Sequence, residues 1–364
     1  MGPPFDSGCQ AAAERVEIAA VEPIVFQSLY QERVWGGREL EHVYDRTLPQ
    51  AEVPYGEAWE VVDREPEQSV VDQGEWAGRS LHELWTTRRE ELFGAGLEGF
   101  ERFPLLIKIL DARDDLSIQV HPPAPLAATM GGEPKTEMWF LAACEPGARL
   151  YVGLKHGVTR ADFEAALHAG TVADCVHALT PQPGESIFIR SGRIHAIGAG
   201  VLIFEIQQNS DTTYRVFDWN RQGLDGKPRA LHVAESLASI DFDDYEPTMD
   251  PPNAGVLADC EFFKVVKHEL ADGERLGNPL PGRFSLVAVV AGTLQSAGGR
   301  RLAAGTVAML PRAAAPLTSI GAATVLQIVI PESAGPKADS IPALGSALGF
   351  IHKSPTAESR KGDA

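Results

Sequence analysis

Residues 116–121 read L-S-I-Q-V-H, a short run in which apolar and polar side chains alternate. Alternate side chains of an extended strand lie on the same face, so Ser117, Gln119 and His121 share one face and the apolar residues between them share the other. The segment therefore predicts a strand with one polar and one apolar face. Its imidazole and amide make it a candidate part of a divalent metal site.

Two further segments carry side chains that suit the same site. In the run K-T-E-M-W at 135–139, Lys135 and Glu137 fall on one face of a second predicted strand. Residues 184–195 read G-E-S-I-F-I-R-S-G-R-I-H, which predicts a strand and a tight Ser-Gly turn that returns His195 toward the same cavity. Two imidazoles, a carboxylate and an amide oxygen suit Zn²⁺ and leave room for water or substrate. Each residue alone is more often an ordinary surface or core residue, so only the joint pattern carries the prediction.

The regions around these segments are dense in short apolar runs separated by glycine and proline, which predicts short strands packed as a sandwich or barrel. Strands are expected at 58–62, 104–110, 116–121, 136–142, 149–153, 186–190 and 200–207, and a second series at 284–291, 306–310 and 323–330. The second series contains no histidine between His268 and His352. If it repeats the first series, it is a metal-free repeat.

Two segments show helical spacing of apolar residues instead. The first covers about 80–93 and begins with a serine that can cap a helix. The second is expected over about 159–180, where Thr159 offers a cap ahead of Phe163 and Leu167. The expected fold class is therefore mainly β with helical insertions.

The charge balance restricts the possible partners. The chain has 364 residues and a formal net charge of −18, so its field repels nucleic acids and anionic membrane surfaces. A small anionic substrate remains compatible with this charge if a local basic pocket receives it. Ser117, which shares the face of Gln119, is a candidate phosphate donor, and Lys108 and Arg221 are candidate cations for such a pocket.

The cysteines and the N-terminal residues indicate the compartment. Cys9, Cys144, Cys175 and Cys260 are far apart and form no C-x-x-C pair, so free thiols are expected. Residues 1–21 contain acidic and basic side chains without a continuous apolar run, and no later run reaches the ~18 residues of a membrane helix. A cytoplasmic protein is the expectation.

Four segments in a fixed order carry a family resemblance. They are L-S-I-Q-V-H-P at 116–122, K-T-E-M-W at 135–139, G-E-S-I-F-I-R-S-G-R-I-H-A at 184–196 and E-I-Q-Q-N-S-D-T-T-Y-R-V-F-D-W at 205–219. Together they resemble type I mannose-6-phosphate isomerase, specifically its shorter bacterial form. Weaker similarity at 56–61 and 103–112 extends the resemblance over most of residues 22–330.

The resemblance implies a bicupin, in which two jelly-roll-like β-barrels follow one another and only the first carries metal. The expected units are a loose N-terminal leader at 1–21, a catalytic cupin domain at 22–260, a metal-free cupin-like domain at 261–332 and a C-terminal tail at 333–364. It also implies one Zn²⁺ per chain and the interconversion of mannose 6-phosphate and fructose 6-phosphate by proton transfer through a cis-enediol.

Position within the motifs carries the family's functional residues onto this chain. Zinc ligation falls on Gln119, His121, Glu137 and His195, the catalytic arginine on Arg215, and further positions linked to the reaction or its pocket on Lys135, Glu205 and Asp211. The second cupin motif departs from the usual pattern, since Arg190 replaces a proline and Ala199 an asparagine. Neither position is a ligand, so the departure concerns loop geometry alone.

Several alternatives stay open at this point. The proton carrier is either Lys135, if its pKa is lowered, or Glu205 acting directly as a carboxylate base. Two competing functions are a cupin dioxygenase using Fe²⁺ and O₂, which the K-T-E and N-S-D-T-T-Y-R segments disfavour, and a non-catalytic sugar-binding cupin. The expected partner is a small phosphorylated sugar. A monomer is compatible with the sequence, which does not predict the oligomeric state.

Overall fold

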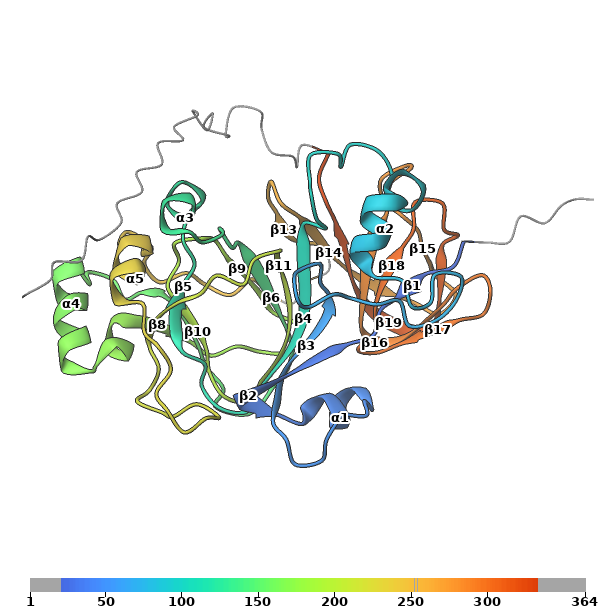
Figure 1. The fold of residues 1–364 in the computed structure, drawn as a ribbon. Helices are drawn as coiled ribbons and strands as arrows, with labels where there is room; N and C mark the ends of the chain where they lie inside the picture. The colour runs from blue at the N-terminus through green and yellow to red at the C-terminus, as the bar shows by residue number, and fades with distance from the viewer. Residues whose placement is uncertain (1–20, 252, 254, 333–364) are drawn as a thin grey trace, which may run out of the picture.

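The computed structural model describes residues 21–251, 253 and 255–332, which form three β-sheets with helices at their edges (Figure 1). The mainly β prediction is confirmed. All pairs of named strands are antiparallel. None of the helices in the described ranges combines the length and apolarity needed to cross a lipid bilayer.

Two of the sheets belong to the N-terminal two-thirds of the chain. The six-stranded sheet has the order β2 (Leu29–Gly37), β3 (Tyr55–Val61), β4 (Leu105–Ala112), β11 (Val201–Gln208), β6 (Glu137–Cys144) and β9 (Ser186–Ile189). The five-stranded sheet has the order β12 (Tyr214–Phe217), β5 (Ile118–Val120), β10 (His195–Ile197), β7 (Leu150–Leu154) and β8 (Val176–Leu179).

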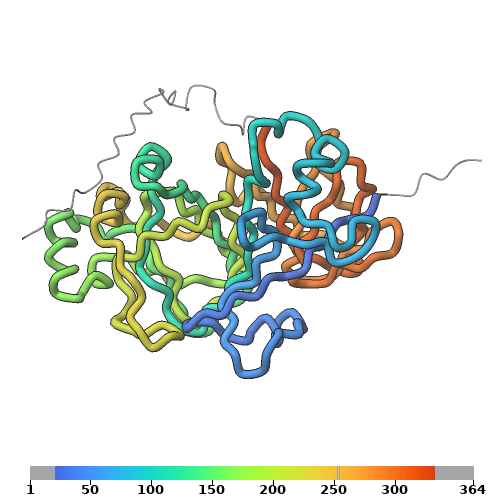
Figure 2. Tube along the Cα trace, viewed as in Figure 1, coloured from blue at the N-terminus to red at the C-terminus, as the bar shows by residue number. Residues whose placement is uncertain are grey.

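The third sheet is eight-stranded and mostly C-terminal. Its main path is β1 (Ile24–Val25), β18 (Val307–Leu310), β16 (Ser285–Gln295), β19 (Leu317–Val329), β14 (Lys264–Leu270) and β13 (Gly255–Asp259), with β15 (Arg275–Leu276) paired to β19 and β17 (Arg301–Ala303) to β16. Figure 2 shows the blue β1 segment lying among the orange C-terminal strands. This sheet therefore includes two strands, β1 and β13, from the 22–260 range expected for the catalytic domain.

The helices are short. They are α1 (Glu39–Tyr44), α2 (Leu81–Thr87), a π-helical turn at Arg89–Phe93, α3 (Ala124–Met130), α4 (Arg160–Ala169), a 3₁₀ turn at Val172–Cys175 and α5 (Val233–Ser239). Ser80 caps α2 by accepting a hydrogen bond from the Glu83 backbone N–H at 3.1 Å, as the serine position predicts. The segment at 80–93 is thus helical but contains two consecutive helical pieces.

The helix expected to run from 159 to about 180 is shorter than that prediction. Thr159 and Asp162 form a capping box at its start. The helix ends at Ala169 because Gly170 is its C-cap. Gly170 adopts the left-handed conformation with φ of 72°, which turns the chain out of the helix. The residues expected to be the last helical turn instead form strand β8. Apolar residues after Gly170 were wrongly assigned to the helix, since their spacing fits either structure.

Side-chain alternation on the six-stranded sheet separates two hydrophobic layers. On β4, Ile107 and Ile109 pack toward the eight-stranded sheet, whereas Leu110 packs toward the five-stranded sheet. Strand β11 repeats the pattern, with Phe204 on the first side and Ile203 on the second. A third apolar cluster joins the five-stranded sheet to α4 and α5. The polar residues of the site lie where the five- and six-stranded sheets face each other.

An aromatic cluster fixes α2 and its π-helical turn against the C-terminal sheet. Trp85, Phe93, Phe103 and Phe284 are all buried, and their ring centroids lie 4.9–6.0 Å apart in edge-on or tilted pairs. Such aromatic pairs add about 0.5–1.5 kcal/mol each beyond burial of their area. The cluster therefore stabilises the contact between the six- and eight-stranded sheets, on the side away from the polar site.

Candidate metal centre and active-site pocket

A row of polar residues crosses the five-stranded sheet. Gln119 on β5 lies opposite His195 on β10 and, on its other side, opposite Arg215 on β12. His121 follows one residue after the end of β5. Glu137, the first residue of β6, belongs to the facing six-stranded sheet. Four separate segments of the sequence thus meet in the space between the two sheets.

His121, Glu137 and His195 form a compact buried triad. Glu137 Oε1 lies 3.7 Å from His121 Nε2 and 3.5 Å from His195 Nε2, and the three ligating atoms all lie within 4.8 Å of one another. The side chains of all three are at most 1% exposed. This is the spacing at which one metal ion can contact a donor atom from each residue.

The other ring nitrogens fix the state of both histidines. His121 Nδ1 donates to the Thr212 carbonyl at 2.8 Å, and His195 Nδ1 donates to the Arg193 carbonyl at 2.9 Å. A carbonyl only accepts, so each neutral ring carries its proton on Nδ1 and directs the lone pair of Nε2 toward the carboxylate. Within the described residues, His121 Nε2 and Glu137 Oε1 have no hydrogen-bond partner. Acceptors that face one another in a buried space fit a bound cation.

The electrostatic surroundings keep this donor set free of protons. Burial lowers the pKa of His195 to about 4, with a further contribution from His121, and burial together with the Lys135 charge holds the pKa of His121 well below its usual range. Burial opposes ionisation of Glu137, but the Lys135 ammonium, the His195 ring and hydrogen bonds with Glu205 and Lys135 together outweigh it and lower the Glu137 pKa to about 2. Two neutral imidazoles and a carboxylate are the protonation states that bind a divalent metal.

Gln119 is the fourth polar group at the triad. Its amide nitrogen lies 3.4 Å from His195 Nε2, and its oxygen accepts a hydrogen bond from Ser117 Oγ at 3.2 Å. Ser117, Gln119 and His121 therefore lie along one side of the strand, as the alternation predicts. The amide is adjacent to the triad, but its oxygen is directed at Ser117.

The turn that carries His195 is held by backbone and charge. Gly192 has φ of 89°, a conformation that glycine adopts without strain, and its N–H donates to the His121 carbonyl at 2.8 Å. Arg190, which stands in place of the family's proline, pairs with Asp241 at 2.7 Å and Asp244 at 3.0 Å. Arg193 pairs with the same Asp244 at 2.7 Å. These ion pairs hold the loop to the segment after α5.

A chain of alternating charges covers the floor of the site on the six-stranded sheet. Lys135 Nζ lies 2.8 Å from Glu137 and 3.6 Å from Glu205, and Lys108 Nζ lies 3.4 Å from Glu205 and 3.5 Å from Glu57. All five side chains are buried or nearly so. Their mutual pairing satisfies charges that would otherwise be costly to bury.

The two candidate proton carriers differ within this chain of charges. Burial raises the pKa of Glu205, as does the neighbouring Glu137 charge, against the opposing effect of Lys135. Burial acts to lower the pKa of Lys135, but Glu137 and Glu205 outweigh it and raise that pKa above its ordinary value. Lys135 is therefore protonated at neutral pH. The lowered pKa that a lysine base needs is not found.

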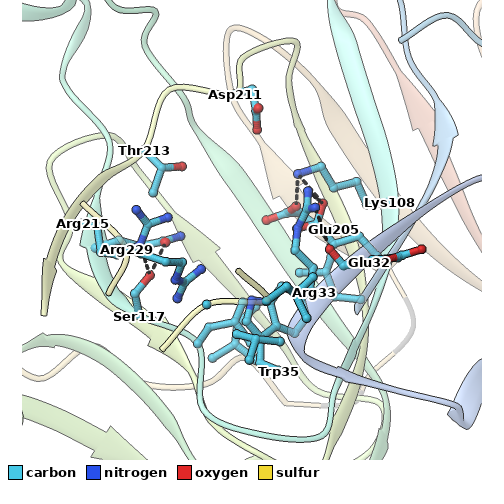
Figure 3. Close-up of a pocket in the computed structure, with 18 of the residues that line it drawn as sticks. Glu32, Arg33, Trp35, Lys108, Ser117, Glu205, Asp211, Thr213, Arg215 and Arg229 are labelled. Carbon is cyan, nitrogen blue, oxygen red and sulfur yellow. Dashed lines mark hydrogen bonds and ion pairs between the residues drawn. The ribbon is translucent and has the colours of Figure 1, made fainter. Parts of the chain in front are cut away.

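A pocket of about 570 Å³ opens over these residues (Figure 3). Seven of the residues selected from the sequence line it: Lys108, Ser117, Gln119, Lys135, Glu205, Asp211 and Arg215. The triad is not among the lining residues, but Gln119 and Lys135, which contact His195 and Glu137, are. Arg221 is not among the lining residues, because its guanidinium pairs with Asp218 at 2.9 Å and Asp114 at 3.4 Å.

Several lining residues were not selected from the sequence, among them Arg33, Glu57, Trp139 and Arg229. Glu57 falls in the segment 56–61 and Trp139 in K-T-E-M-W, where Trp139 shares the face of Glu137, so alternation alone indicates the position of Trp139. Arg33 and Arg229 come from segments without a motif. Only the fold places Arg33 3.1 Å from Glu57.

Comparison with known proteins identifies close relatives of this chain. The family model of the phosphomannose isomerase type I catalytic domain matches residues 24–143. The mannose-6-phosphate isomerase ManA of Bacillus subtilis is 36% identical over 280 residues, which span 74% of this chain and 86% of that protein. The mannose-6-phosphate isomerase of Streptococcus mutans is 35% identical over 283 residues, spanning 74% and 85%.

Solved structures agree with these sequence matches. The crystal structure of the mannose 6-phosphate isomerase from Bacillus subtilis aligns with a TM-score of 0.73 and 28% identity, covering 85% of this chain and 99% of that one. A phosphomannose isomerase from Salmonella typhimurium aligns with a TM-score of 0.65 at 16% identity, over 85% and 99% of the two chains. The second likeness concerns the fold alone.

Proposed function

The chain belongs to the type I phosphomannose isomerase family, which makes it an aldose–ketose isomerase, and we propose that it interconverts mannose 6-phosphate and fructose 6-phosphate. The observation that carries this proposal is the closeness of the buried triad His121, Glu137 and His195 to the pocket carboxylate Glu205, since Lys135 Nζ lies 2.8 Å from Glu137 and 3.6 Å from Glu205. Isomerisation requires a group that polarises oxygen and a group that moves a proton between C1 and C2. The pocket contains residues suited to both tasks.

We propose one Zn²⁺ per chain, held by His121, Glu137 and His195 with Gln119 as the fourth ligand. When bound, the ion supplies Lewis acidity that polarises the carbonyl and hydroxyl oxygens of the sugar. Rotation of the Gln119 amide about its last bond would exchange its nitrogen and oxygen. Ser117 accommodates either orientation, since its hydroxyl donates as well as accepts. The orphaned His121 Nε2 and Glu137 Oε1 support a cation at this place.

Glu205 is the residue we propose as the proton carrier. It lines the pocket, and Lys108 and Lys135 hold its carboxylate from two sides at 3.4 and 3.6 Å. In the forward direction the carboxylate removes the proton from C2 of the aldose while the C1 oxygen gains a proton, which gives the cis-enediol. The carboxylate then returns its proton to C1 as the C2 hydroxyl loses its own, which gives the ketose with a net transfer of one hydroxyl proton from O2 to O1. Lys135 is less suited, because its ammonium is already engaged with Glu137 at 2.8 Å.

Arg215 is the group we propose to orient the sugar and to stabilise negative charge on its oxygens. Its guanidinium lines the pocket, and its Nε donates to Ser117 Oγ at 3.1 Å. A guanidinium stays charged at neutral pH, so it acts by attraction and hydrogen bonding rather than as a base. Asp211 lies at the mouth of the same pocket and is exposed, which suits a contact with sugar hydroxyls.

The finer architecture is part of the same proposal. We propose that the five- and six-stranded sheets form one cupin barrel around the pocket and that the eight-stranded sheet forms a second, metal-free one. The units are at about 22–260 and 261–332, with β1 and β13 of the first range added to the second barrel. The facing apolar layer between the first two sheets supports the first barrel. We further propose a cytoplasmic location, based on the separated cysteines.

The decisive test joins metal analysis to a coupled assay for fructose 6-phosphate formation. Chelated protein should lose isomerisation, and added Zn²⁺ should restore it. Arg215→Ala should fold with unchanged circular dichroism and lose most of its kcat/KM, because a charge-assisted contact to the substrate disappears. Full activity in protein shown to be metal-free would exclude the metal role. Absence of isomerisation in the zinc-loaded wild-type protein would exclude the function.

A further inference from the structure

Residues 209–213, N-S-D-T-T, form a bridge from the end of β11 to the start of β12. Asp211 and Thr213 of this bridge line the active-site pocket (Figure 3). Thr212 lies between them in the sequence, and its carbonyl accepts the Nδ1–H of fully buried His121 at 2.8 Å. The bridge therefore contributes to the pocket wall and also sets the orientation of one proposed metal ligand.

The Asn209 end of the bridge is held from outside the pocket. The Asn209 side chain is buried, and its Nδ2 donates to the carbonyls of Asp63 at 2.8 Å and Phe103 at 2.7 Å. The Asn209 carbonyl accepts from Arg64 Nη1 at 2.8 Å and from Arg102 Nη2 at 2.9 Å. None of these four partners lines the pocket. Two remote segments of the chain thus fix both the side chain and the backbone carbonyl of Asn209.

The Thr212 end of the bridge is held by the loop that precedes β6. Thr212 Oγ1 accepts from the Glu133 N–H at 3.0 Å, and the Glu133 carbonyl accepts from Ser210 Oγ at 3.2 Å. Gly132 permits this close approach, because a Cβ at that position would lie only 2.8 Å from Thr212 Cγ2. The Thr212 hydroxyl is therefore the side-chain group that ties the bridge to this loop.

Ion pairs also join the two ends, but they are the weaker part of this clamp. The Glu133 carboxylate pairs with Arg64 at 2.8 Å and with Arg102, and the side chains of Glu133 and Arg102 are each 37% exposed. Pairs with this exposure contribute little, because water and salt screen them. Asn209 is only 7% exposed, so loss of its amide would leave buried carbonyls without a donor. The neutral hydrogen bonds of the bridge therefore decide its position.

We propose that Asn209 and Thr212 are positioning residues for His121. Their contacts outside the pocket hold the Thr212 carbonyl where it keeps the His121 proton on Nδ1 and leaves the lone pair on Nε2, directed at Glu137 and His195. A displaced carbonyl would let the proton move to Nε2, which then could not bind a metal. This inference rests on the proposed zinc site and adds to it residues that touch neither metal nor sugar.

The zinc affinity of the full chain, measured by competition with a chromophoric chelator, tests the inference. Thr212→Val keeps the shape of the side chain but removes the hydroxyl, so the zinc dissociation constant should rise about tenfold, the lower end of the effect of losing a partner behind a metal ligand. Thr212→Ser keeps the hydroxyl and should stay close to wild type. Thr129→Val is the matched control, because the Thr129 hydroxyl donates to the Leu126 carbonyl within α3 and does not contact the bridge.

Nitrogen NMR of the isotope-labelled full chain, freed of metal, gives a second readout that needs neither zinc nor activity. The His121 signal is identified by its loss in His121→Gln. Wild type should carry the His121 proton on Nδ1, and Thr212→Val should show a detectable share on Nε2. If Thr212→Val unfolds, Gly132→Ala receives the same measurements, since its methyl group displaces Thr212 while the hydroxyl is kept.

Three outcomes overturn the inference. The first is a zinc dissociation constant for folded Thr212→Val within twofold of wild type. The second is equal weakening in Thr212→Ser and Thr212→Val, since the hydroxyl would then not be the cause. The third is an unchanged His121 tautomer in Thr212→Val. A zinc-loaded wild type without isomerisation would overturn the proposed function alone, and a wild type that binds no zinc would overturn the zinc site. In both cases the tautomer measurement still decides whether the bridge positions His121.

Discussion

Burial of the proposed zinc ligands predicts that the affinity for Zn²⁺ depends very little on pH between 7.5 and 5.5. Protons compete with the metal for the histidine Nε2 atoms, so affinity falls as the pH drops through the pKa of each ligand. In the folded protein that pKa is about 4 for His195 and well below the usual range for His121, while Glu137 has a pKa of about 2. The loss of affinity is therefore displaced to acid conditions, below about pH 5.

The size of the effect follows from these values. An ordinary histidine with a pKa of about 6.5 is roughly 90% protonated at pH 5.5, which weakens metal binding about tenfold for one such ligand and about 100-fold for two. A histidine whose pKa is about 4 is almost wholly neutral at pH 5.5. His195 and His121 together should therefore weaken binding less than about twofold over this range. At pH 6.5, zinc binding should release almost no protons, against about one for two ordinary histidines.

Competition with a chromophoric zinc chelator, corrected for the chelator's own protonation, measures the dissociation constant at each pH. Calorimetry in two buffers of different ionisation enthalpy counts the released protons. His195→Gln serves as the control, because it should weaken binding at every pH and so show that the measured ion occupies this site. Weakening of more than tenfold between pH 7.5 and 5.5 would refute the reasoning, since the buried imidazoles would then be ordinary bases.

Three further changes give separate expectations. Glu205→Gln preserves shape but removes the proposed base, so kcat should fall by about 10²- to 10⁴-fold at unchanged zinc content; a kcat within threefold of wild type would return the role to another group. Phe103→Ala empties a fully buried position in the aromatic cluster and should cost about 3–5 kcal/mol, seen as a lower thermal midpoint. Thr159→Ala removes the capping box of α4 and should cost about 0.5–2 kcal/mol in urea unfolding, with isomerisation unaffected because α4 lies outside the pocket.

The parts of the site that sequence analysis located are those governed by local periodicity. Ser117, Gln119 and His121 lie on one side of β5 because side chains in any strand alternate with period two. The same rule placed Lys135 beside Glu137, whose charged atoms are 2.8 Å apart. The general position of His195 followed from the Ser-Gly turn, which Gly192 makes with positive φ. Each of these inferences depends only on the local geometry of one strand or one turn and not on the tertiary structure.

The parts that sequence analysis missed depend on which strands are neighbours. Lys108 lines the pocket, but its place opposite Glu205 follows only from the pairing of β4 with β11. Arg33 pairs with Glu57 only because β2 lies beside β3. Arg221 and Arg229 both pair with the buried Asp218, yet only Arg229 lines the pocket, and no local pattern in the sequence separates them. Pairing partners of this kind leave no periodic signal.

The site contains six charged side chains around one pocket, and their charge balance gives a reason for this number. Glu57, Glu137 and Glu205 contribute three negative charges, and Arg33, Lys108 and Lys135 contribute three positive ones, all linked in one chain of ion pairs. If the lysines were absent, the carboxylates would cancel the charge of a divalent ion and repel an enediolate. Because the chain's own charges already balance, a bound dication would leave the reacting end net positive. The lysines therefore matter through the carboxylates that they neutralise, even though neither is proposed to carry the proton.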